Sequence, residues 1–267
     1  MKPLVISAFA IAALTAGGAH AGRSCEALAP ATATVVRGLV LAERTHAALE
    51  AEHGRAGTQV VVLARAGQDL GRYGLRYSHL GFAYRTRDDA GAPVWRVLHK
   101  LNQCGTADSA LYRQGLGEFF LDDLWRHEAA WVTLAPAVQD RLWPLLQAGP
   151  VDRLHQRRYS IVSYAWSTRY QQSNQWAIEV LAGAMDDRIA TREQAQAWLM
   201  RKDYRPTTLH VGAFKRLGAR ITAANVAFDD HPDAKRFADR IETVTVDSVF
   251  DWLRRAQLGA PAVALRL

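Results

Sequence analysis

The chain has little of several residue types, and each shortage excludes a class of protein. Its 267 residues include only 2 cysteines, 9 prolines and 19 glycines. This composition excludes a small disulfide-knit protein and a fibrous protein, and the 49% share of hydrophobic residues excludes a disordered chain. One or two ordinary globular domains remain. Because no internal repeat and no long linker interrupts the sequence, we expect one domain.

Long uncharged runs are also scarce, and the one that stands out lies at the N-terminus. Lys2 precedes the apolar segment 4–14, and the small-residue sequence Ala19-His20-Ala21 follows. This order is typical of a secretory signal peptide, and the apolar segment is too short for a membrane anchor. We therefore predict a signal peptide at residues 1–21 and a single α+β domain at 22–267, in the periplasm or secreted. No transmembrane anchor should remain after cleavage.

The charge of the chain is positive but dispersed. The formal net charge is +7, with Lys and Arg scattered along the sequence. Scattered cations and an export signal argue against nucleic acid as a partner. A basic surface in the cell envelope instead favours anionic material, so cell-wall peptide or lipid is the expected partner class. The oligomeric state stays open.

The two cysteines, Cys25 and Cys104, both lie beyond the predicted cleavage site. In an oxidising compartment an even pair most simply forms one disulfide bond. Cys25 is also close enough to the cleavage site to be compared with a lipoprotein acceptor. Arg23 places a charge where such acceptors follow apolar and small residues, so we do not expect lipidation.

The patterns of hydrophobic residues predict a mixture of helices and strands. Segments Tyr77–Tyr84 and Val94–Leu101, joined by a charged turn, form a predicted β-hairpin. The most apolar helical stretch is Gln175–Met185, which should be a central buried helix. Thr191 begins a further helix, because Gln194 stands at the capping-box spacing. Other predicted helices are 33–52, 118–126, 137–147 and 247–256; predicted strands are 59–64, 130–134 and 242–246, and 159–166 is either strand or loop.

Three polar residues in apolar surroundings attract attention. His79 and His99 lie on the two hairpin strands, and Ser173 directly precedes the apolar helix. Each has a plain structural explanation: a hydrogen-bonded histidine, a solvated strand face, and a helix N-cap shared with Asn174. Together they match what acyl transfer needs, namely a base oriented by a second polar group and facing a nucleophile at a helix N-terminus.

The order of these segments resembles a known fold. Tyr77-Ser78-His79-Leu80-Gly81-Phe82-Ala83, followed by the helix at 172–181, resembles the circularly permuted papain-like hydrolases, which include NlpC-type enzymes and relatives of lecithin:retinol acyltransferase. This resemblance covers about residues 58–185. The whole mature chain also resembles domain of unknown function family 2145, a family of uncharacterised exported bacterial proteins. The papain-like resemblance implies an antiparallel sheet packed on a central buried helix.

The papain-like resemblance implies roles for individual residues. His79 corresponds to the catalytic base and His99 to the residue that orients it. Ser173 stands where the family has its catalytic cysteine. Backbone amides around Ser173 and Asn174 would stabilise the oxyanion, and Tyr77 and Gly81 would line the groove. No metal or other cofactor is implied, and the sequence contains neither a paired-ligand metal motif nor a phosphate-binding loop.

The serine leaves two functions open. A serine hydroxyl stays protonated and needs a closely placed base, whereas a cysteine in such a site can hold a thiolate. The protein is therefore either an acyl hydrolase or transferase acting on amide or ester bonds through Ser173 and His79, or a non-catalytic envelope binding module. A competing arrangement uses Cys104 at the start of a helix through Arg113, with His127 or His155 as base.

Overall fold

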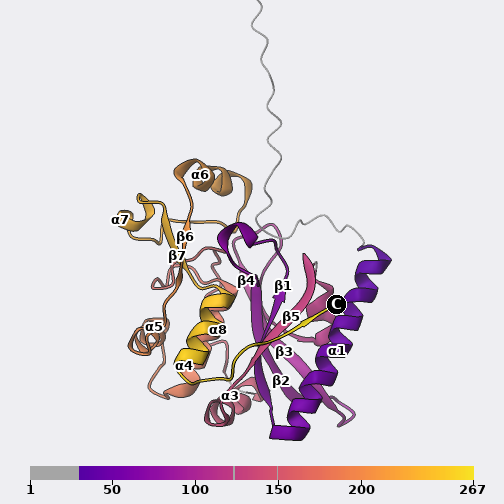
Figure 1. Cartoon of the computed structure of the whole chain (residues 1–267). Coiled ribbons are helices and arrows are strands. Elements are labelled where there is room, and N and C mark those ends of the chain that lie inside the picture. The colour runs from indigo at the N-terminus through magenta and orange to yellow at the C-terminus, as the bar shows by residue number, and fades with distance from the viewer. Residues whose placement is uncertain (1–29, 123, 149) are drawn as a thin grey trace, which may run out of the picture.

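An antiparallel sheet of six strands forms the framework of the molecule, in the order β4-β3-β2-β1-β5-β8 (Figure 1). The structure is a computed structural model that describes residues 30–122, 124–148 and 150–267; the predicted signal peptide and Cys25 lie outside them. The strands are β1 (Val60–Ala66), β2 (His79–Arg87), β3 (Pro93–Asn102), β4 (Ser109–Gly115), β5 (Arg126–Thr133) and β8 (Val263–Arg266). A short 3-10 helix, Gly71–Tyr73, precedes β2.

Both faces of this sheet are covered. All seven residues of β1 are buried, and successive side chains of a strand point to opposite faces. Val61 and Leu63 belong to one apolar cluster, while Val60 and Val62 belong to another. The unbroken apolar sequence of β1 therefore reflects burial on both sides.

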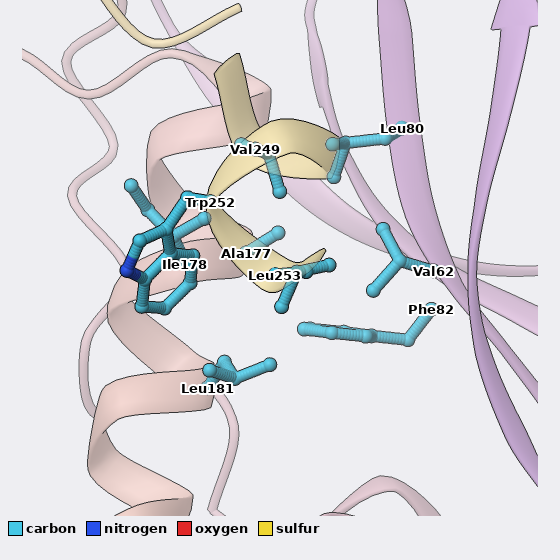
Figure 2. A pocket seen from close by; sticks show the side chains of 9 residues that line it. All are labelled: Val62, Leu80, Phe82, Ala177, Ile178, Leu181, Val249, Trp252 and Leu253. Atoms are coloured by element: carbon cyan, nitrogen blue, oxygen red, sulfur yellow. The ribbon is translucent and has the colours of Figure 1, made fainter. Parts of the chain in front are cut away.

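Different helices cover the two faces. On one side, here called the α2 face, lie α1 (Thr32–Ala56) and α2 (Leu116–Leu121). On the other, the α4 face, lie α3 (Pro136–Ala148), α4 (Ser173–Met185) and α8 (Val246–Arg255), with α5 (Arg192–Arg201) packed on α4. Figure 2 shows Leu80 and Phe82 of the sheet pointing toward side chains of α4 and α8.

A second, smaller sheet lies beyond the α4 face. It pairs β6 (Thr207–His210) with β7 (Arg240–Thr243) in antiparallel fashion. The helices α6 (Ala213–Thr222) and α7 (Asp233–Arg236) lie in the connection between the two strands (Figure 1). A separate apolar cluster holds this region together: Leu209, Val211, Val226, Phe228 and Ile241.

The sequence patterns predicted the centre of the fold correctly. The α+β class, the hairpin formed by β2 and β3, and the buried helix α4 are all present. Twelve consecutive residues of α4, from Ser173 to Ala184, are buried. Thr191 caps α5 and its hydroxyl accepts a hydrogen bond from the amide of Gln194, as the capping-box spacing predicts.

Other predicted elements were wrong. The helix expected at 118–126 ends at Leu121, and Arg126 already begins β5. The helix that the competing arrangement needs after Cys104 does not form, because Ser109–Gly115 is β4 and pairs with β3. The helix predicted at 33–52 is present as α1 but extends to Ala56, and its C-cap is Gly57, whose φ of +67° suits a residue without Cβ.

Candidate functional site

The two hairpin histidines form a hydrogen-bonded chain on the α2 face. His79 Nε2 lies 2.8 Å from His99 Nδ1, and His99 Nε2 lies 2.8 Å from Gln114 Oε1 on β4. His99 is fully buried and His79 partly buried. Both rings contact the ring of Phe119 on α2, at centroid distances of 5.9 and 5.3 Å. The predicted pairing of His79 with an orienting His99 is thus present, and the prediction of a solvated His99 was wrong.

The direction of these hydrogen bonds follows from the acceptor at the end of the chain. Because Gln114 Oε1 can only accept, His99 donates from Nε2, and a neutral His99 must then accept at Nδ1. His79 therefore donates from Nε2 and keeps a lone pair on Nδ1. Among the described residues, no hydroxyl or thiol hydrogen-bonds to that nitrogen. The hydrogen-bonded histidines thus provide a candidate base, His79 Nδ1, but no nucleophile beside it.

The surroundings keep both histidines neutral. Burial, followed by the positive charge of Arg65 and the neighbouring His99, holds the pKa of His79 well below its usual range. Burial and Arg65 lower the pKa of His99 to about 4, against the opposing effects of Gln114 and Asp122. Arg65 is itself buried, donates to the carbonyl of Phe119 and forms an ion pair with Asp122. At neutral pH both imidazoles are therefore uncharged, and they lie near the positive charge of Arg65.

Gly81 makes room for His99 rather than for a substrate. A Cβ at Gly81 would lie 2.7 Å from His99 Cβ and 3.0 Å from the carbonyl oxygen of Leu98. Real Cβ atoms do not approach so closely, so any other residue would force the strands or the imidazole to move. The expected role of Gly81 in a groove is therefore not seen: His99 fills the space beside it.

Ser173 lies at the start of α4 but does not cap it. The N-cap is Gln172, whose side chain accepts a hydrogen bond of 2.9 Å from the amide of Asn174. Ser173 is 5% exposed and its side chain hydrogen-bonds to the hydroxyl of Tyr159. Burial raises the pKa of Tyr159, and the bond to Ser173 opposes that rise. The expectation of a Ser173 N-cap was wrong, because the preceding side chain performs that role.

The sheet separates Ser173 from the histidines. Leu80, which follows His79, packs with Trp176 and Ala177 of α4 in the cluster on the α4 face. Since neighbours on a strand point to opposite faces, His79 points away from α4, in agreement with its contact to Phe119. Figure 2 shows Leu80 and Phe82 on the α4 side. The structure thus unites His79 with His99 and does not bring Ser173 to either.

Asn174 and Tyr77 also have other partners than the resemblance implies. Asn174 Oδ1 accepts a hydrogen bond of 3.1 Å from the amide of Leu80, which ties α4 directly to β2. Tyr77 is buried and donates to Glu128 Oε1 over 2.6 Å. The helix end and the strand therefore pack together where the groove was expected. Two small cavities, of about 10 and 30 Å³, are lined by none of the predicted site residues, and the first, shown in Figure 2, has room for one water at most.

A polar network that the sequence analysis missed occupies the α4 face. Lys100, the neighbour of His99 on β3, is fully buried and donates over 2.7 Å to both Gln156 O and Gln171 Oε1. Its Nζ lies 6.0 Å from the centroid of the Tyr159 ring. Burial, aided by Arg192 and opposed by Glu179, lowers the pKa of Lys100 to about 6. A base candidate thus lies on the same side of the sheet as Ser173.

The centre of this network is a buried carboxylate in the most apolar helix. Glu179 accepts hydrogen bonds of 2.7 and 3.0 Å from Arg192, 2.5 Å from Gln171 and 2.8 Å from Gln196. Glu179 is 0% exposed. A single acidic residue inside an otherwise apolar helix is the sequence signal that could have revealed the network, because a buried charge requires partners.

Of the two cysteines, Cys104 alone lies within the described residues. Cys104 lies in the turn between β3 and β4, and Cys25 lies outside the described ranges, so the disulfide stays a prediction. In the described ranges no group of three or more His, Cys, Asp or Glu could hold a metal ion. There, too, no helix has the length and apolar character needed to cross a bilayer.

Comparison with known proteins identifies the family. Residues 52–253 match the family described as "Uncharacterized protein conserved in bacteria (DUF2145)". The chain belongs to this family. The match includes both histidines, Ser173 and the Glu179 network, so these candidate residues lie within the part shared with the family. Neither the curated proteins nor the solved structures contain a significant match to the chain.

Proposed function

We propose that this protein is an exported envelope module that binds its ligand without catalysis, on a core in permuted papain-like order. The observation that carries the proposal is the position of the sheet between Ser173 and His79. Acyl transfer needs the base within hydrogen-bond reach of the nucleophile, and a strand between them removes that contact. Cell-wall peptide or lipid is the ligand class, as the basic charge and the N-terminal segment suggest.

The hydrogen bond of Ser173 supports a structural role for the residue. Its hydroxyl is buried against Tyr159, and the neighbouring Asn174 holds the helix to β2. Both groups serve the packing of α4. A Cys25–Cys104 disulfide belongs to the same proposal, because it would leave no free thiol for a reaction. Two free thiols in the denatured, unreduced protein would overturn this part.

A serine-directed fluorophosphonate followed by intact mass measurement tests the proposal. We expect no adduct on the purified wild-type protein, and the same result for Ser173→Ala. Ser163→Ala is a matched control, since Ser163 is a buried serine at the same helix end and donates to Gln175. An adduct that disappears in Ser173→Ala and persists in Ser163→Ala would overturn the non-catalytic proposal.

One observation favours a second candidate, acyl hydrolysis through Ser173 with a different base. Tyr159 and Lys100 lie on the same side of the sheet as Ser173, and a lysine with a pKa of about 6 is mostly neutral at pH 7. In such a reaction Ser173 Oγ attacks the acyl carbon while its proton passes through Tyr159 toward Lys100, which returns a proton to the leaving amine or alcohol. Water then attacks the acyl-serine and gives its proton back by the same route, which releases the acid and restores the Ser173 hydroxyl. An adduct lost in both Ser173→Ala and Lys100→Met, but kept in His79→Gln, would establish this arrangement.

A further inference from the structure

Helix α6 presents its apolar side chains outward. Phe214 is 92% exposed, Leu217 59% and Ile221 76%. These residues stand at positions i, i+3 and i+7, so at about 100° per residue they lie within an arc of roughly 60°. Soluble proteins seldom expose a contiguous apolar patch without using it. The three side chains form one narrow face, called here the α6 face.

This exposure does not arise from a loosely attached helix. The opposite side of α6 packs through Ala219 against the apolar cluster of the small sheet. Arg216, 8% exposed, donates to the backbone carbonyl of Val211 and forms a 2.5 Å ion pair with Asp239. The inner side of α6 is thus fixed by apolar and ionic contacts, which holds the α6 face away from the protein.

Helix α8 shows the ordinary arrangement for comparison. It is also strongly amphipathic, and its apolar residues Val249, Trp252 and Leu253 are buried against α4 and the main sheet. In α6 the large apolar residues instead face outward and the small alanine faces inward. Figure 1 places α6 at one end of the molecule, beyond the small sheet.

Cations border the α6 face on both sides. By the same helical spacing, Lys215 and Arg220 lie about 100° and 120° from Phe214 in opposite directions. α6 contains these two cations and Arg216, and no acidic residue. Within the described residues, no ion pair joins Lys215 or Arg220 to a carboxylate. An apolar stripe between two cationic flanks complements a surface that has acyl chains beneath anionic headgroups.

We propose that the α6 face docks on an anionic phospholipid bilayer, with Phe214, Leu217 and Ile221 inserted at the boundary of headgroups and acyl chains. Lys215 and Arg220 then lie at the level of the phosphates. The charge pattern favours this occupant over a second copy of the chain, whose own α6 face carries the same cations. The inference deepens the proposed envelope module by naming its ligand surface, and it needs no assumption about Ser173.

Sedimentation with vesicles tests the docking. Purified protein is mixed with phosphatidylglycerol–phosphatidylcholine vesicles and, separately, with pure phosphatidylcholine vesicles. We expect binding to the anionic vesicles that weakens at high salt. The triple change Phe214→Ser, Leu217→Ser, Ile221→Ser should reduce binding at least tenfold. The double change Lys215→Glu, Arg220→Glu should reduce binding to anionic vesicles and leave residual binding to neutral ones unchanged.

Two matched controls come from other helices. Val36→Ser, Leu39→Ser and Met200→Ser remove three exposed apolar side chains outside α6, and Arg37→Glu with Arg44→Glu reverses two exposed charges on α1. Both should bind vesicles like wild type, and circular dichroism should show the native fold in every variant. Vesicle binding that the α6 triple change leaves intact would overturn the proposal. A wild-type dimer in light scattering that this change converts to monomer, without vesicle binding, would instead assign the face to a second copy.

None of these outcomes depends on the fluorophosphonate result. A catalytic Ser173 would refute the non-catalytic proposal and leave the docking intact. Loss of docking would leave the question of catalysis unchanged.

Discussion

The two faces of the main sheet hold different kinds of polar network, although each also contains a buried arginine–carboxylate ion pair. On the α2 face, His79 and His99 are kept neutral and joined to Gln114 in a single hydrogen-bonded chain. On the α4 face, Glu179 and Arg192 are buried as charges and joined in a network of ion pairs and amides. Adjacent residues of β3, His99 and Lys100, belong to different faces and thus to different networks. Because successive side chains of a strand point to opposite faces, two adjacent residues can belong to networks that do not touch.

The largest effect should follow from breaking the charged network. Glu179→Ala leaves Arg192 buried without its carboxylate, and removing one partner of a buried ion pair typically costs roughly 3–5 kcal/mol. Urea unfolding of both proteins measures this loss. Glu193→Ala, which removes an exposed carboxylate from the first turn of α5, should cost about 1 kcal/mol or less. Equal losses in the two variants would mean that the network is not buried as described.

Acid should destabilise the α2 face through its histidines. His99 has a pKa of about 4 in the folded protein, below the ordinary value of 6.5. Between these values the unfolded chain binds more protons, so stability is complete above pH 6.5 and falls as the pH drops toward 4. The expected slope is at most about 1.4 kcal/mol per pH unit for each such histidine.

Urea unfolding at pH 7.5, 6.5 and 5.5 measures this slope. His99→Asn should have a shallower slope than wild type over the two lower values, because it removes one neutral histidine. The contrary result is an identical pH dependence in the two proteins, which would mean that folding does not lower the pKa of His99.

Disturbing the close approach of β2 and β3 at Gly81 should have an intermediate effect on stability. Gly81→Ala puts a Cβ 2.7 Å from that of His99 and should destabilise the fold by about 1–3 kcal/mol. Gly54→Ala is the matched control, since no atom lies within 4 Å of its added Cβ and it stands in helix α1. That change should stabilise the protein by up to about 1 kcal/mol. Thermal denaturation distinguishes the two directions.

The smallest effect should come from Ser173. Ser173→Ala removes the hydrogen bond to Tyr159 and should cost about 1 kcal/mol. Because His79 lies across the sheet, the loss should be the same in a His79→Gln background, within about 0.5 kcal/mol. A double-mutant cycle of urea unfolding gives this coupling. A coupling above 1 kcal/mol would show that the two faces are not independent.

The sequence predicted elements better than it predicted the site. The hairpin, α4 and the cap of α5 follow from local patterns: alternation, a long apolar helix, and the Thr191–Gln194 spacing. The pairing of His79 with His99 was predictable once the hairpin was, because the two strands are neighbours.

Which helices cover which face of the sheet could not be predicted from local patterns. β2 reads Leu-Gly-Phe-Ala-Tyr after His79 and is buried on both sides, so the pattern does not show which side α4 covers. The position of Ser173 relative to His79 depends on that packing alone. The exposed face of α6 was missed for a related reason: its amphipathic sequence does not say whether the apolar side faces the protein.

The central claim, that His79 is held by His99 and not by Ser173, is tested most directly by the nitrogen-15 chemical shifts of the His79 ring. These shifts report which ring nitrogen carries the proton and which is hydrogen-bonded. They should be the same in wild type and Ser173→Ala and should change in His99→Asn, with the His79 signals assigned by their loss in His79→Gln. A change of the His79 shifts in Ser173→Ala, with none in His99→Asn, would contradict the account.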